Sequence, residues 1–153
     1  ICAGLWTGKI HFQFDHKANP DAAIEFLKKN HLQGYMFNNE TFGDSLIYTA
    51  WPQYRVFVDG RSDMYGASRM REYIDVVFLS PDWNRILAKY DINWVFETAG
   101  SRLSVLLLQS DSWRLIYADK VAHIFLKNIP QNERILRGFG SVTQPVPTDM
   151  PIS

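Results

Sequence analysis

The chain has 153 residues, of which 46% are hydrophobic and 14% aromatic, which is enough for one domain with a full core. Lys+Arg and Asp+Glu each number 16, so the formal net charge is zero; this argues against a nucleic-acid partner, because phosphate binding needs a basic face. The single cysteine, Cys2, excludes an intramolecular disulfide framework and a cysteine-rich metal site.

Apolar periodicity and turn residues predict an alternation of helices and strands along the chain. The first predicted element is a half-buried strand over residues 9–14, where apolar residues occupy every second position. The predicted helices cover residues 19–30, 42–51, 67–78, 81–90, 101–109 and 132–137. The predicted strands cover residues 35–37, 55–58 and 93–97, and residues 115–126 are predicted to form a hairpin that turns at Asp119 and Lys120.

This alternation predicts an α/β fold: a three-layer-like mixed sheet with central parallel strands, an antiparallel C-terminal hairpin, and helices packed on the faces. We divide the chain into an N-terminal segment (1–18), an α/β domain (19–128) and a C-terminal extension with a Pro-rich tail (129–153). The sequence contains no apolar run of about 18 residues that could span a bilayer. Because the chain begins without methionine and ends in a Pro-rich tail, we expect it to be a segment of a longer protein.

Two polar clusters follow predicted strands, one over residues 38–44 and one over residues 59–65. In α/β proteins, ligands usually bind at the carboxyl ends of strands. If both strands lie in one parallel sheet, both clusters emerge at the same edge. The candidate substrate-binding residues are therefore Asn39, Glu40, Asp44, Asp59, Arg61, Asp63 and Tyr65.

These clusters support more than one chemistry. Asp59 and Asp63, with Glu40 or Asp44 as a third carboxylate, could hold Mg²⁺ or Ca²⁺ through oxygen ligands, or the two aspartates could cap a turn and a helix. Arg61 could clamp a phosphate or carboxylate in bidentate fashion. Its alternative is an internal ion pair with Glu40, Asp44 or Asp59, which we favour because an arginine among several acids is usually satisfied internally.

Other motifs of catalysis are absent from the sequence. The four histidines have no metal-ligand spacing, the glycines form neither a dinucleotide-binding motif nor a P-loop, and there is no Gly-x-Ser-x-Gly elbow, so no cofactor is expected. His123 lies among apolar residues of a predicted strand and is expected to point outward. Gly60 is expected to adopt a turn conformation that a side chain would strain. Four aromatic residues near the polar clusters could stack on a sugar or pack in the core: Tyr48, Trp51, Tyr54 and Tyr65.

Several short sequence motifs occur in a fixed order along the chain, and together they indicate a protein family more specifically than any one of them alone. They include Pro20-x-x-Ala23-x-x-Phe26-Leu27, Phe42-Gly43-Asp44, Tyr54-x-Val56-Phe57-Val58-Asp59-Gly60-Arg61-x-Asp63-x-Tyr65 and Trp83-x-x-Ile86-Leu87. In this pattern, about residues 18–127 resemble the C-terminal soluble domain of bacterial polytopic membrane proteins, which themselves resemble lipid-linked-sugar-dependent (GT-C type) glycosyltransferases. A more distant similarity is to the soluble domain of oligosaccharyltransferases, but residues 39–43 lack the paired tryptophans and the aspartate of its Trp-Trp-Asp-Tyr-Gly motif.

The resemblance implies a non-catalytic domain on the extracytoplasmic (periplasmic or extracellular) face of a bacterial membrane. In such glycosyltransferases the catalytic acid lies on a loop of the membrane domain, so this domain alone would not be active. Residues 1–18 would be juxtamembrane-like, and the implied partners are the protein's own transmembrane domain and a lipid-linked sugar or its acceptor. The alternative from another class is a free-standing, phosphoesterase-like α/β domain that binds a small ligand or a divalent metal.

Overall fold

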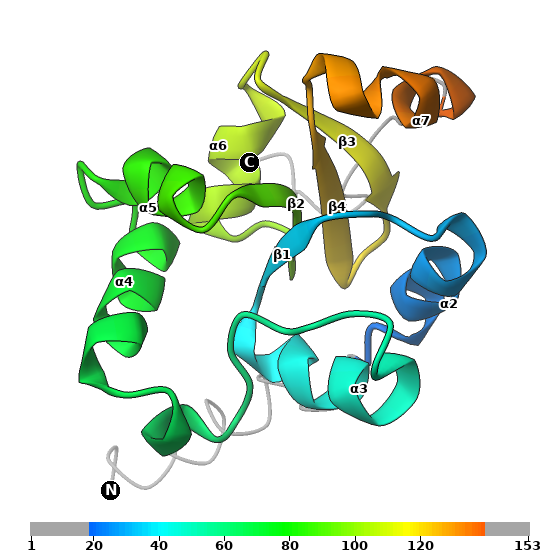
Figure 1. The fold of residues 1–153 in the computed structure, drawn as a ribbon. Helices are drawn as coiled ribbons and strands as arrows, with labels where there is room; N and C mark the ends of the chain where they lie inside the picture. The colour runs from blue at the N-terminus through cyan, green and yellow to red at the C-terminus, as the bar shows by residue number, and fades with distance from the viewer. Residues whose placement is uncertain (1–18, 140–153) are drawn as a thin grey trace, which may run out of the picture.

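The computed structural model describes residues 19–139, which form a four-stranded mixed sheet with helices packed around it (Figure 1). The strands take the order β1-β2-β4-β3, with β1 at Tyr35–Asn38, β2 at Ile92–Thr98, β3 at Trp113–Ala118 and β4 at Ala122–Lys127. β1 runs parallel to β2, and β4 is antiparallel to both β2 and β3. The predicted α/β mixed sheet with a C-terminal hairpin is therefore confirmed. Its parallel part is a single pair, and a hairpin strand lies inside the sheet.

Helices form where the sequence pattern predicts them. Their bounds are α2 Asp21–Asn30, α3 Glu40–Ala50, α4 Ala67–Val77, α5 Trp83–Lys89, α6 Arg102–Leu108 and α7 Glu133–Gly138, with short 3₁₀ turns at Ser62–Met64 and Pro130–Asn132. Two helices have side-chain caps. The Asn39 side chain accepts a hydrogen bond from the Thr41 N–H at the start of α3, and Ser101 accepts one from the Ser104 N–H at the start of α6. Such caps satisfy N–H groups that have no partner within the helix.

Each face of the sheet is covered by its own hydrophobic core. Helices α2, α3 and α7 pack over one face, where Trp94, Phe96 and Ile124 are fully buried. Helices α4, α5 and α6 pack over the other face, around Val95 and Phe125. Figure 1 shows α4 and α5 on one side of the sheet and α2 and α3 on the other. Because side chains alternate between faces along a strand, the apolar runs of β2 and β4 supply both cores.

Residues 55–58, which were predicted as a strand, do not join the sheet. Phe57 and Val58 are buried as their apolar character requires, but their backbone groups bond to the side chain of Asn38. The Phe57 N–H donates to Asn38 Oδ1 at 2.6 Å, and Asn38 Nδ2 donates to the Val58 carbonyl at 2.8 Å. A buried backbone needs such partners, and here one amide side chain supplies what a strand ladder would. The prediction of a strand at 55–58 is wrong for this reason.

Several sequence features lie outside the described residues: the predicted strand over 9–14, Cys2 and the Pro-rich residues 144–151. Within residues 19–139, no helix has the length and apolar character needed to cross a bilayer. The packed residues continue through α7, where Leu136 is buried in the same core as α2 and α3.

Candidate functional site

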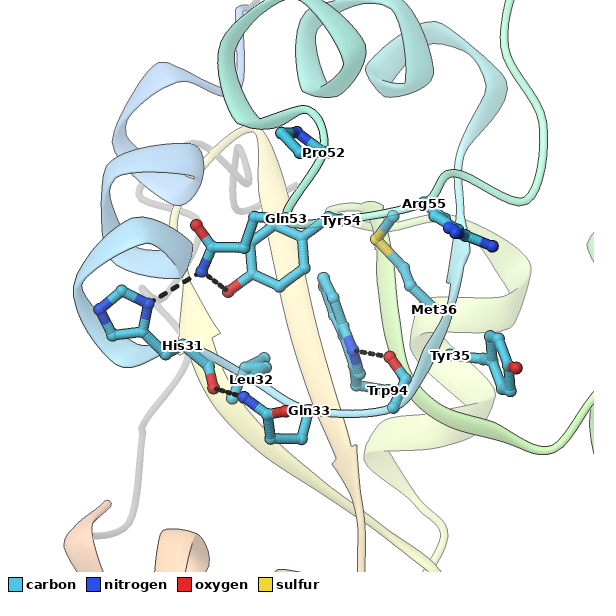
Figure 2. Close-up of a pocket in the computed structure, with 11 residues that line it drawn as sticks. His31, Leu32, Gln33, Tyr35, Met36, Pro52, Gln53, Tyr54, Arg55 and Trp94 are labelled. Atoms are coloured by element: carbon cyan, nitrogen blue, oxygen red, sulfur yellow. Dashed lines mark hydrogen bonds between the residues drawn. The ribbon is translucent and has the colours of Figure 1, made fainter.

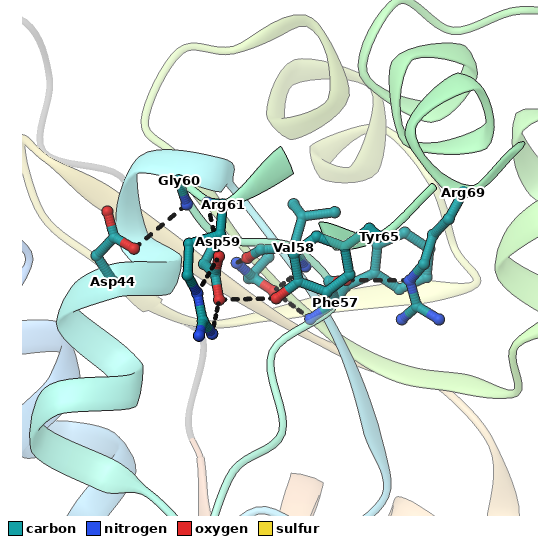
Figure 3. A network of polar contacts seen from close by, with 9 residues as sticks. Asp44, Phe57, Val58, Asp59, Gly60, Arg61, Tyr65 and Arg69 are labelled. Carbon is teal, nitrogen blue, oxygen red and sulfur yellow. Dashed lines mark hydrogen bonds and ion pairs between the residues drawn. The ribbon is translucent and has the colours of Figure 1, made fainter. Parts of the chain in front are cut away.

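Asp59 is the centre of a polar network at the carboxyl end of β1, which we call the Asp59 network (Figure 3). The Asp59 side chain is fully buried and accepts four hydrogen bonds. Oδ1 accepts from the Arg61 backbone N–H at 2.8 Å and from Arg61 Nε at 3.2 Å. Oδ2 accepts from Arg61 Nη2 and from the Tyr65 hydroxyl, both at 2.7 Å. The internal ion pair that we favoured for Arg61 is therefore present, with Asp59 as its partner.

The same contacts set the protonation states of the Asp59 network. Hydrogen bonds from Arg61 lower the pKa of Asp59 from 3.8 to about 2, against the opposing effect of burial. The Tyr65 hydroxyl, partly buried and bonded to the Asp59 carboxylate, has its pKa raised to about 12. Asp59 is therefore an anion and Tyr65 a neutral donor at neutral pH. The Arg61 side chain is 58% exposed, so its outer face reaches solvent while its inner face holds Asp59.

The two polar clusters of the sequence meet at the start of α3. The Gly60 N–H donates to Asp44 Oδ1 at 3.2 Å. A Cβ at Gly43 would lie 2.3 Å from the Val58 carbonyl oxygen, so only glycine lets α3 approach this segment so closely. Gly60, by contrast, does not have a positive φ, and the atoms nearest to a Cβ there belong to the Asp44 carboxylate, the closest at 2.8 Å. The strained turn conformation expected at Gly60 is therefore absent, and the tighter steric requirement for glycine is at Gly43.

Asn39 and Glu40, from the first cluster, face β2 and α4 instead of Asp59. Asn39 Nδ2 donates to Glu97 Oε1 at 2.8 Å, and the Glu40 backbone N–H donates to the Tyr73 hydroxyl at 2.9 Å. Glu97, at the end of β2, is only 2% exposed; the Thr98 N–H also donates to Oε1, and Oε2 has no partner among the described residues. Burial raises the pKa of Glu97 above its ordinary value of 4.5. Glu97 was not among the predicted site residues, although an acid at the end of an apolar strand is a signal that could have found it.

The structure does not assemble the metal site considered above. Asp63 lies on the short 3₁₀ turn with an exposed side chain, while Glu40 begins α3 and contacts Tyr73 through its backbone. Across residues 19–139, no group of three or more His, Cys, Asp or Glu side chains is placed to hold a metal ion. Because Asp59 already accepts four hydrogen bonds, a cation there would have to displace Arg61.

His123 does not point to solvent, as its position in the sequence predicted. It is 4% exposed, and its Nδ1 lies 2.6 Å from the Oγ of the fully buried Ser104 on α6. Burial lowers the pKa of His123, so the imidazole is neutral at neutral pH. The prediction failed because α6 covers this face of β4. The Ser104–His123 pair has the residue types of a nucleophile and base, but both side chains are closed off from solvent.

The aromatic residues near the clusters divide into core and surface. Tyr54 is buried against Trp94, whereas Tyr48 and Trp51 are 92% and 61% exposed. Tyr54 and Trp94 also line a cavity of about 520 Å³ beside the start of β1 (Figure 2). Two residues of its lining are joined by a hydrogen bond, with Gln53 Nε2 lying 2.9 Å from His31 Nδ1.

Comparison of the chain with protein-family models, curated proteins and solved structures found no match.

Proposed function

We propose that this chain is the non-catalytic extracytoplasmic domain of an integral membrane protein of glycosyltransferase type, and that it contributes substrate contact or stability to the whole protein. The observation that carries the non-catalytic part is the state of Asp59. All four of its hydrogen bonds come from Arg61 and Tyr65 of the same chain. A carboxylate so occupied, with its pKa lowered to about 2, is a poor general base and an unavailable metal ligand.

The packing of the two motif segments supports a role in positioning. Gly43 of the first segment contacts the Val58 carbonyl of the second, and Asp44 holds the Gly60 N–H. Together with the Asp59 network, these contacts fix the loop that carries Arg61 while leaving more than half of the Arg61 side chain exposed. An arginine held by a buried carboxylate is preorganised to contact an anionic or hydroxyl-rich surface.

The test is made on the native protein in its source cell. An antibody against this chain is used to follow membrane fractionation and protease access from the outer face of spheroplasts. The proposal predicts a species larger than 153 residues that sediments with membranes and is cut from outside. A soluble species of about this size would refute it.

A second measurement tests the rival metal-binding function. A divalent ion at 100 times its dissociation constant would stabilise the fold by about 2.7 kcal/mol, which is several degrees in melting temperature. We expect no shift with Mg²⁺ or Mn²⁺. A shift that disappears in Asp59→Ala would favour the phosphoesterase-like alternative.

A further inference from the structure

A second cavity, of about 440 Å³, opens beside the start of β1 and the turn between α5 and β2. Its apolar wall includes Tyr35, Phe57 and Tyr90, and its charged wall includes Arg55 and Arg69. We call this cavity the arginine pocket. It lies toward the amino end of β1, whereas the Asp59 network lies beyond the carboxyl end. The two adjoin at Arg69, whose guanidinium carbon lies 5.9 Å from the ring centroid of Tyr65 (Figure 3).

Arg69 is held in place by contacts that leave most of its donors unused. Its Nε donates to the Phe57 carbonyl at 3.1 Å, and its guanidinium carbon lies 4.3 Å from the Phe57 ring centroid and 5.1 Å from that of Tyr90. Its two terminal nitrogens make no hydrogen bond or ion pair with any residue of the described region. A planar guanidinium fixed by stacking, with its terminal N–H groups free, suits bidentate binding of a carboxylate or phosphate.

Arg55 provides a second free cation in the same pocket. It is exposed and forms no side-chain hydrogen bond or ion pair within residues 19–139. Figure 2 shows its side chain on the opposite side of the first cavity from His31, on the side where Tyr35 lies. Tyr35, Met36 and Arg55 line both cavities, so the two open next to each other along the start of β1.

The charges around the arginine pocket leave a local excess of positive charge. Lys89 also lines the pocket, but it pairs with Glu72, whose pKa is lowered mainly by the Lys89 hydrogen bond. The remaining charged side chains of the lining are Arg55, Arg69 and one acid, Asp91. In a chain of zero net charge, two arginines against one acid make this pocket attractive to an anion.

We propose that the arginine pocket binds a ligand whose phosphate or carboxylate group is attached to a ring. The anion contacts Arg55 and Arg69, and the ring packs on the aromatic wall formed by Tyr35 and Tyr90. A bound anion would also accept from the terminal N–H groups of Arg69, which have no hydrogen-bond partner among residues 19–139. This inference does not depend on the membrane assignment, so either proposal can fail without the other.

The test titrates the full 153-residue chain, ¹⁵N-labelled, with phenyl phosphate, benzoate, inorganic phosphate and benzyl alcohol, followed by NMR. We expect saturable shifts of the Arg69 Nε and of the Phe57 and Tyr90 amides with phenyl phosphate or benzoate, which identifies the preferred anion. Inorganic phosphate should bind more weakly because it lacks the ring. Benzyl alcohol should not bind because it lacks the charge, and added salt should weaken binding.

Matched variants separate the pocket from general charge. Arg55→Gln should weaken binding about tenfold or more, the range expected for one charge-assisted contact. Arg71→Gln removes the same charge from an exposed position of α4 outside the pocket and should change binding less than about twofold. Arg69→Lys keeps the positive charge but removes the planar guanidinium, so it tests whether bidentate contact is needed. Its melting temperature is measured to show that the variant is folded. Equal affinity of the Arg55 and Arg71 variants, binding of benzyl alcohol as tight as that of phenyl phosphate, or no saturable shift up to about 10 mM ligand would overturn the proposal.

Discussion

Replacing Asn38 with leucine tests whether one side chain takes the place of a strand ladder. Asn38 is fully buried, accepts from the Phe57 N–H at 2.6 Å and donates to the Val58 carbonyl at 2.8 Å. Leucine has a similar size but can make neither bond, so the buried Phe57 N–H and Val58 carbonyl lose their partner, and the Val58 N–H loses a longer contact of 3.4 Å. At about 2 kcal/mol for each orphaned group, the cost is about 4 kcal/mol. For a chain of this size, that lowers the melting temperature by about 12 °C.

The assay is urea unfolding followed by tryptophan fluorescence, because Trp94 is buried beside Tyr54 and reports loss of the core. Asn84→Leu is the control, since Asn84 is exposed on α5 and bonds through its side chain to no described residue. We expect the control to change the free energy of unfolding by less than about 0.5 kcal/mol. A loss below about 1 kcal/mol in Asn38→Leu would refute the reasoning, because it would mean that residues 55–58 find other partners.

Three further changes probe the same edge of the sheet. Gly43→Ala should cost about 3 kcal/mol in chemical unfolding, because its Cβ would lie 2.3 Å from a backbone oxygen and α3 must shift. Asp59→Asn should make the free energy of unfolding less dependent on pH between 4 and 2. The pKa of Asp59 is lowered from 3.8 to about 2, so its ionised form stabilises the wild type above pH 4, and this stabilisation is lost as the pH falls toward 2. Glu97→Gln should stabilise the fold increasingly as the pH rises. Burial raises the pKa of Glu97 above 4.5, so the wild type loses stability from that pH upward while its carboxyl is forced to ionise. Both pH effects are measured by urea unfolding over a pH series.

Each of these expectations has a result that would contradict it. Gly138→Ala, where a Cβ meets nothing within 4 Å, is the control for Gly43→Ala, and equal stability of the two variants would remove the argument from close packing. For Asp59→Asn, a deficit relative to wild type that stays constant between pH 4 and 2 would show that the carboxylate charge is not stabilising. For Glu97→Gln, a gain in the free energy of unfolding that does not change with pH would show that ionisation of the Glu97 carboxyl is not what destabilises the wild type.

Local pattern was sufficient to predict most of the fold. The helices and the hairpin follow from periodicity, caps and turn residues within a few positions of each other, and the structure confirms the resulting α/β mixed sheet. Residues 55–58 were beyond such reasoning. Their apolar run requires burial, but whether it pairs as a strand is decided by Asn38, which lies about twenty residues earlier in the chain. Burial and pairing are separate properties, and only burial is encoded locally.

The site was predictable in its location but not in its pairing. Two polar clusters after apolar segments do come together, through Asp44 and Gly60. The sequence could not show that Asn39 would turn to Glu97, because that contact joins residues 58 apart. The prediction that His123 points to solvent failed for a related reason. Alternation along β4 tells which side chains share a face of the sheet, but both faces are covered by helices. Arg69 was missed because its importance comes from the aromatic rings that surround it.

The burial of the carboxyl groups of Asp59 and Glu97 distinguishes a catalytic role for this site from a positioning role. Arg61 lowers the pKa of Asp59, and burial raises the pKa of Glu97. Carboxyl groups with pKa values driven apart in this way are typical of acid–base catalysis. Here, however, Asp59 is fully buried behind Arg61 and Glu97 is 2% exposed behind Asn39, so a substrate could reach either group only if these partners moved away. Catalysis would have to break the contacts that hold the loop in place, and this favours a site that presents Arg61 to a partner over one that performs chemistry.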